Sequence, residues 1–135
     1  MEYVIATTVS TDEIHLADGT VFGNQPGSAG FYALAGVRMF TDKVAVCGGI
    51  GPEYLPRHEK WYKDNGVSTE GLVLRSDISP TIVIHYYPDG SRTDEPNIGL
   101  KEFRALDPSP DEVFRCCDQN TKGVYVFKDV ERDYL

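Results

Sequence analysis

Residues 43–52, Lys-Val-Ala-Val-Cys-Gly-Gly-Ile-Gly-Pro, are the stretch that decides the fold class. Their first half, residues 43–47, is a short apolar run rich in β-branched side chains and predicts a buried strand. Gly48–Gly51 end this run, and Pro52 suits the first position of a helix. We expect that helix to continue to Asn65-Gly66, a common stop signal. A buried strand that turns directly into a helix is typical of α/β proteins.

Further strands and helices are predicted on both sides of this stretch. Apolar runs that favour strands occur at residues 2–6, 71–74, 81–87 and 123–127. One helix is predicted over residues 26–39, and another begins after Ser109, a cap residue followed by Pro110. Because helices alternate with buried strands, we predict an α/β fold with a mainly parallel sheet flanked by helices.

Two excursions interrupt this alternation of strands and helices. Asp18-Gly19 lies between two strand-forming runs and is a strong signal for a β-hairpin. Residues 88–91, Pro-Asp-Gly-Ser, form a second turn, after which the chain returns through residues 92–94. We expect both excursions to pair with each other in a small sheet outside the main layer.

Glycines inside the first predicted helix indicate close packing. Gly30 and Gly36 both lie in it, and a glycine there costs about 1 kcal/mol relative to alanine. We therefore expect a neighbouring segment to lie close to the helix backbone at both positions.

Composition and charge exclude several classes of partner. The 135 residues fit one domain, with 41% hydrophobic and 25% charged residues. Thirteen Lys and Arg residues against 21 Asp and Glu give a net charge of -8, which argues against binding to nucleic acid or an anionic membrane. Cys47, Cys116 and Cys117 cannot all pair within one chain, so we predict a reduced, cytoplasmic protein.

Candidate cofactor motifs in the sequence are weak. Gly48–Gly51 could cradle a phosphate at a helix N-terminus, but the dinucleotide fingerprint fails at Tyr54. We interpret the segment as a tight turn without a ligand. His15, His58 and His85 lack metal-ligand spacing, so no metal site is predicted.

Asp12 and residues 26–30 are the better candidates for a binding site. Asp12 follows the first strand region, and ligands of open α/β sheets lie at the carboxyl ends of strands. Its carboxylate could accept hydrogen bonds from two vicinal hydroxyls, or it could be a solvated turn residue. The small residues Pro-Gly-Ser-Ala-Gly at 26–30 would let a ligand approach the backbone, or let the helix pack closely on the sheet. Both alternatives stay open for each feature.

Taken together, these residues resemble the N-terminal half of the ribokinase-like (phosphofructokinase-B type) carbohydrate kinases. The resemblance runs from Val4 to about Asp129. It rests on the order and spacing of six segments, at residues 8–12, 26–30, 43–52, 64–69, 79–81 and 87–92.

The resemblance implies an ATP-dependent kinase that phosphorylates a hydroxyl of a sugar or sugar derivative. Residues 1–135 would be its N-terminal, substrate-binding part, with a β lid from about residues 13–25 and 80–96 that could mediate a homodimer. ATP and Mg²⁺ are expected for the complete enzyme. The substrate-binding residues that it implies are Asp12, Gly27, Ser28, Phe31, Arg92 and Asp129.

The sequence also departs from the family pattern. Pro26, Phe31 and Pro52 stand where the family has Gly, Asn and Asp. A phenyl ring cannot supply the hydrogen bonds of an asparagine, so the ligand is not expected to be an ordinary free sugar. The Gly-Ala-Gly-Asp signature, which supplies the general base and the anion-stabilising helix N-terminus, does not occur in the 135 residues. We therefore expect this chain alone to be inactive, with no catalytic or cofactor-binding residues of its own.

Two other interpretations remain open at this stage. The chain could be a half-length, non-catalytic module that binds a sugar or dimerises. It could also be an unrelated nucleotide-binding α/β domain that uses the Gly48–Gly51 turn.

Overall fold

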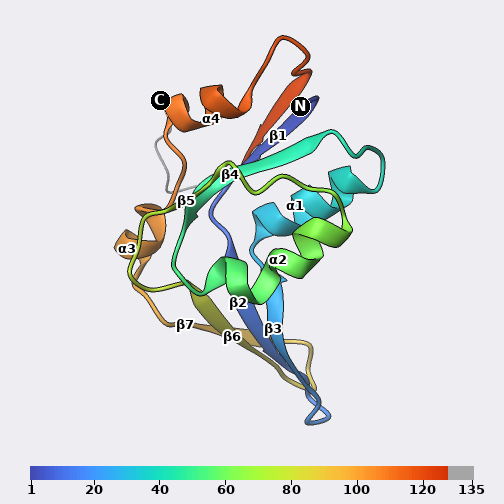
Figure 1. Ribbon diagram of the computed structural model, residues 1–135. Helices are drawn as coiled ribbons and strands as arrows, with labels where there is room; N and C mark the ends of the chain where they lie inside the picture. The colour runs from blue at the N-terminus through green and yellow to red at the C-terminus, as the bar shows by residue number, and fades with distance from the viewer. Residues whose placement is uncertain (128–135) are drawn as a thin grey trace.

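Two four-stranded sheets organise the computed structural model, which describes residues 1–127 (Figure 1). Sheet A is parallel throughout, with strand order β5-β4-β1-β8. Its strands are β1 (Tyr3–Ala6), β4 (Val44–Ile50), β5 (Leu72–Leu74) and β8 (Gly123–Val126). The parallel order agrees with the predicted α/β fold class.

Helices cover both faces of sheet A. Figure 1 shows α1 (Ala29–Arg38) and α2 (Tyr54–Asp64) on one face and α4 (Pro110–Cys116) on the other. The core lies on the α1 and α2 side because alternate strand residues point to one face. Val44 and Val46 of β4 pack there with Leu34 and Tyr54. Burial of such side chains contributes roughly 1.5–3 kcal/mol each to stability.

Sheet B is formed by the two predicted excursions. It contains β2 (Ser10–His15), β3 (Val21–Gly27), β6 (Thr81–Tyr86) and β7 (Arg92–Pro96), in the order β3-β2-β6-β7. The hairpins β2–β3 and β6–β7 are antiparallel, and the central pair β2–β6 is parallel. This pairing confirms that the excursions join each other outside sheet A, and Figure 1 shows sheet B extending away from it.

The glycine segment at residues 48–51 differs from the predicted turn. Gly48 and Gly49 belong to β4, where they pair with β5. A Cβ on Gly48 would lie 1.9 Å from the carbonyl oxygen of Thr7, and one on Gly51 would lie 2.3 Å from the amide nitrogen of Ser79. Glycine therefore lets other backbone segments lie directly against the end of β4.

Helix boundaries agree with the sequence in part. Ser109 caps α4 with a capping box, as its Ser-Pro signal predicts. Helix α2 begins at Tyr54 with Glu53 as its cap, so Pro52 precedes the helix and is not its first residue. The short helix α3 (Leu100–Arg104) was not predicted from the sequence.

Only one of the two glycines in α1 meets a close neighbour. A Cβ on Gly30 would lie 1.9 Å from the Thr7 hydroxyl oxygen, which confirms close packing there. Nothing lies within 4 Å of a Cβ built on Gly36, so the expectation for Gly36 is wrong. Among residues 1–127, no helix has both the length and the apolar character that spanning a bilayer requires.

Candidate functional site

A cavity of about 440 Å³ lies where sheet B meets the start of α1. Apolar side chains of sheet B and α3 form part of its wall, among them Ile82, Ile84 and Phe103. Its polar lining consists of Thr7, Thr8, Asp12, Ser28, Tyr32, Tyr86, Arg92 and Asp94. A mainly apolar cavity with a few converging polar groups is typical of a small-molecule site.

Asp12 is the buried carboxylate of this cavity. Its residue is 4% exposed, and its carboxylate accepts hydrogen bonds from the Ser10 hydroxyl, at 2.9 Å, and from the Ser28 backbone N–H. Burial raises the pKa of Asp12 above its ordinary value, against the lowering effect of these two donors. The side chain is therefore not a solvated turn residue, which was one of the two interpretations of the sequence.

Gly27 leaves room for the side chain of Asp12. A Cβ on Gly27 would lie 2.0 Å from Oδ1 of Asp12, so a larger residue cannot occupy this place without moving the carboxylate. Both residues belong to paired strands, β2 and β3. The absence of a side chain at Gly27, just before α1, thus leaves the space that the buried carboxylate of Asp12 occupies.

Ser28 has an unusual backbone conformation at the start of α1. Its φ of 85° and ψ of 153° lie in a region that is almost restricted to glycine and costs of order 1–3 kcal/mol. The Ser28 hydroxyl accepts a hydrogen bond from the Phe31 backbone N–H at 3.2 Å. The Ser28 backbone N–H points to Asp12, so the strained residue links the helix cap to the carboxylate.

Charge on the sheet B side of the cavity is balanced. Arg92 forms an ion pair with Asp94 at 3.1 Å, and it hydrogen-bonds to Tyr86. Tyr32, at the start of α1, is 57% exposed, and partial burial together with the charge of Asp12 raises its pKa. The cavity therefore combines one deep carboxylate with hydroxyl and guanidinium groups nearer to solvent.

Most of the residues predicted for the site come together, with two exceptions. Asp12, Ser28 and Arg92 line the cavity, and Gly27 lies against Asp12. Phe31 does not line it: this residue is 5% exposed and packs in the core, with its ring centroid 4.6 Å from that of Trp61. Asp129 lies outside the described residues.

Tyr32 takes the place that the sequence assigned to Phe31. Successive helix residues point about 100° apart, so a shift of one residue moves a side chain from the core to the cavity. The prediction lacked the helix phase, which the strained Ser28 cap sets.

The three histidines lie in two different environments. His58 is buried in α2, with its Nε2 2.7 Å from the Thr11 hydroxyl. His15 and His85 are neighbours on β2 and β6, with ring centroids 4.6 Å apart. This contact joins residues 70 positions apart, so sequence spacing could not reveal it. Within residues 1–127, no group of three His, Cys, Asp or Glu side chains is arranged to hold a metal ion.

The glycine segment of β4 does not offer a nucleotide site. The N–H of Gly48 donates to the Gly71 carbonyl at 3.0 Å, and the N–H of Gly49 donates to the Leu106 carbonyl at 2.7 Å. These donors are therefore not available to a phosphate. The interpretation as an unrelated nucleotide-binding domain that uses this segment is not supported.

A helix-covered parallel sheet, with a second sheet beside a carboxylate-bearing cavity, defines an α/β protein with one candidate small-molecule site at this place. No protein-family model matches the sequence, and no curated protein matches it. Solved structures, in contrast, match the arrangement of its elements well.

Three matched structures identify the fold. Nucleoside kinase from Methanocaldococcus jannaschii, an archaeal member of the ribokinase family, superposes with a TM-score of 0.64 and 15% identity, over 93% of this chain and 44% of its own. Ribokinase from Cryptococcus neoformans, in complex with ADP, superposes with a TM-score of 0.60 and 18% identity. The match covers 71% of this chain and 33% of the ribokinase. Burkholderia thailandensis nucleoside kinase, in complex with inosine, superposes with a TM-score of 0.61 and 13% identity. The match covers 70% of this chain and 36% of the kinase.

The chain therefore has the fold of the N-terminal part of the ribokinase-family sugar and nucleoside kinases. It spans between a third and a half of the length of these three structures. The likeness establishes the fold alone, because proteins of one fold carry out many different functions.

Proposed function

We propose that this chain forms the acceptor-binding part of an ATP-dependent kinase that phosphorylates a hydroxyl of a sugar or sugar derivative. The observation that carries the proposal is the buried carboxylate of Asp12, held at the wall of the cavity by Ser10 and Ser28. A carboxylate so placed accepts hydrogen bonds from two vicinal hydroxyls. Charge-assisted bonds of this kind contribute about 1.5–3 kcal/mol each.

The apolar wall of the cavity supports a sugar derivative over a free sugar. Ile82, Ile84 and Phe103 face the same space as Asp12. A free sugar carries hydroxyls on all sides and would leave some of them unpaired against this wall, which costs affinity. A ribose diol at Asp12 with an apolar or aromatic substituent along the wall would satisfy both surfaces. We propose that Tyr32 contacts the substituent.

Phosphoryl transfer depends mainly on positioning and charge stabilisation. Asp12, Gly27 and Ser28 would fix the acceptor, and Arg92 would reach its outer polar groups. The general base and the anion-stabilising helix N-terminus of the family have no counterpart in the sequence, and the described residues do not form a nucleotide site at Gly48 and Gly49. We therefore propose that ATP and Mg²⁺ are held by parts of the complete enzyme outside these residues, and that this chain alone transfers no phosphate.

Replacing the carboxylate of Asp12 tests the proposal directly. We expect Asp12→Asn to weaken binding of inosine, a ribose derivative, by at least about tenfold, because an amide loses one charge-assisted acceptor and 1.4 kcal/mol is one decade in affinity. Isothermal titration calorimetry of the 135-residue chain measures the effect, with thermal melts to confirm folding.

Asp18→Asn is the matched control for this experiment. Asp18 lies at the tip of the β2–β3 hairpin, where it accepts local hydrogen bonds, among them one from the Thr20 N–H at 2.9 Å. We expect its affinity to equal that of the wild type. Equal affinities of wild type and Asp12→Asn, or no binding of inosine at millimolar concentration, would contradict the proposed acceptor site.

We also propose that sheet B is a lid through which two chains dimerise. Its edge strand β3 has every residue from Val21 to Gln25 exposed, and Val21 and Phe22 are 52% and 48% exposed. An open edge with apolar side chains favours pairing with another strand.

Phe22→Lys is expected to weaken such a dimer at least about tenfold, because a hot-spot aromatic contributes 1.4 kcal/mol or more to an interface. Sedimentation velocity over a concentration series measures the dissociation constant. Phe40→Lys is the control, since Phe40 is 90% exposed and lies between α1 and β4, away from sheet B. A wild-type chain that sediments as a monomer at all concentrations would refute the lid-mediated dimer.

A further inference from the structure

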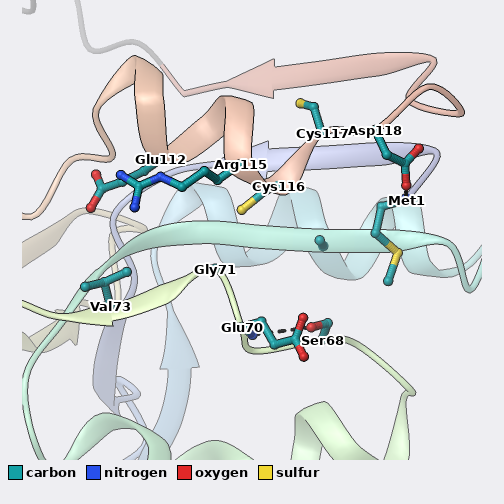
Figure 2. A pocket seen from close by; sticks show the side chains of 11 residues that line it. Met1, Ser68, Glu70, Gly71, Val73, Glu112, Arg115, Cys116, Cys117 and Asp118 are labelled. Atoms are coloured by element: carbon teal, nitrogen blue, oxygen red, sulfur yellow. Dashed lines mark hydrogen bonds and ion pairs between the residues drawn. The ribbon is translucent and has the colours of Figure 1, made fainter.

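Two cysteines from distant parts of the sequence meet beneath α4. Cys47 lies in β4 on the face opposite the main core, and Cys116 ends α4, which covers that face. The two side chains are neighbours, because the Cys116 thiol is among the groups that raise the pKa of Cys47. Figure 2 shows the Cys116 side chain directed from α4 toward β4, whereas that of Cys117 points to the other side.

Gly71 makes room for this contact. A Cβ on Gly71 would stand 2.8 Å from Sγ of Cys116 and 3.2 Å from Cα of Cys47. The sulfur of one cysteine and the backbone of the other thus approach the same small space. Any other residue at position 71 would separate the two.

The pair has an accessible member and a protected one. Cys116 lines a cavity of about 380 Å³ together with Glu70, Glu112 and Arg115 (Figure 2). Cys47 is 1% exposed behind it. Burial, with the neighbouring Cys116 thiol as a second cause, raises the pKa of Cys47 to about 12. Cys117 lines the same cavity, so an oxidant that enters it meets Cys116 and Cys117 before the buried Cys47.

We propose that Cys116 and Cys47 are a redox modification site that forms a disulfide between α4 and β4 on reaction with a hydroperoxide. The Cys116 thiolate attacks the O–O bond of hydrogen peroxide, which gives a sulfenic acid and one water after proton transfer. Cys47 then loses its proton, and its sulfur displaces the hydroxyl group of the sulfenic acid as a second water. Two thiols and one peroxide become one disulfide and two waters.

The disulfide is expected to change the stability of the protein. It closes the chain from residue 47 to residue 116, and this loop contains β6 and β7, one half of sheet B. Restricting so long a loop reduces the entropy of the unfolded chain. The oxidised protein is expected to melt at a higher temperature than the reduced one.

Thiol counting and peptide mapping test the proposal on the 135-residue chain. The reduced chain has three free cysteines. After hydrogen peroxide and removal of excess oxidant, we expect one thiol that reacts with Ellman's reagent under denaturing conditions, a mass lower by two hydrogens, and full reversal by dithiothreitol. Trypsin should release residues 44–57 linked to residues 116–122.

Three variants separate this site from its alternatives. Cys117→Ser is the matched control and should keep the crosslink, whereas Cys116→Ser and Cys47→Ala should abolish it. Cys116→Ser changes a half-buried side chain, so it keeps the test valid if the buried Cys47→Ala fails to fold. Three unchanged thiols, a bridge within residues 116–122, or only intermolecular dimers through Cys117 would overturn the proposal.

Discussion

Gly48→Ala is expected to lower the free energy of unfolding by about 3 kcal/mol or more. The added methyl group would stand 1.9 Å from the backbone oxygen of Thr7, which follows β1. Backbone atoms cannot rotate away as a side chain can, so β1 and β4 would have to separate. Overpacking a core costs about 1–3 kcal/mol even where side chains adjust. Urea unfolding followed by circular dichroism measures the loss.

Gly36→Ala is the control, because it adds the same methyl group at a place where no other atom lies close to it. Nothing lies within 4 Å of a Cβ at Gly36 in α1, and alanine is favoured over glycine in a helix by about 1 kcal/mol. We expect this variant to be more stable than the wild type. A Gly48→Ala chain that unfolds at the same urea concentration as the wild type would show that β4 does not pack against Thr7 in this way.

Acid is expected to destabilise the chain through His58. Burial, with a smaller effect of Arg57, lowers the pKa of His58 to about 4 from 6.5 in the unfolded chain. The unfolded state therefore binds more protons between these two values, so stability is fully present above pH 6.5 and falls as the pH drops toward 4. The loss amounts to roughly 3 kcal/mol, since one pKa unit corresponds to 1.36 kcal/mol.

Urea titrations at several pH values between 7.5 and 4 test this effect. His58→Gln cannot titrate and can still bond to the Thr11 hydroxyl, so its stability should change much less over this range. Asp12 acts with the opposite sign, because its raised pKa favours the folded state in acid. A wild-type curve parallel to that of His58→Gln would contradict the assignment to His58.

Local signals in the sequence predict much of this fold. Asp18-Gly19 marks the β2–β3 hairpin, where Gly19 has a φ of 88°, and Ser109 marks the start of α4. These features depend on residues only a few positions apart. The pairing of the two excursions also follows, because each has an open edge.

The remaining features depend on contacts that no local pattern records. The strand character of Gly48 and Gly49 arises from the backbones of β5, Thr7 and Leu106, which lie against them. Helix α3 has only five residues, too few to show a helical period. Tyr32 and not Phe31 lines the cavity because of the rotational position of each residue around the axis of α1. Asp12 and Ser28 of the candidate site were therefore predictable, although Asp12 lies within β2 and not at a strand end as expected, whereas the contribution of α1 was not.

The order of strands in sheet A has a consequence for synthesis on the ribosome. Strand β1 pairs with β4 and β8, and Tyr3 stands opposite Gly123. Of the described strands β1 is synthesised first, and it acquires its second neighbour only when almost all of the other described residues have followed. Such long-range pairs form slowly, and unpaired apolar strands aggregate in the meantime. The yield of folded protein in a cell therefore depends on whether β1 stays protected during synthesis until β8 is made.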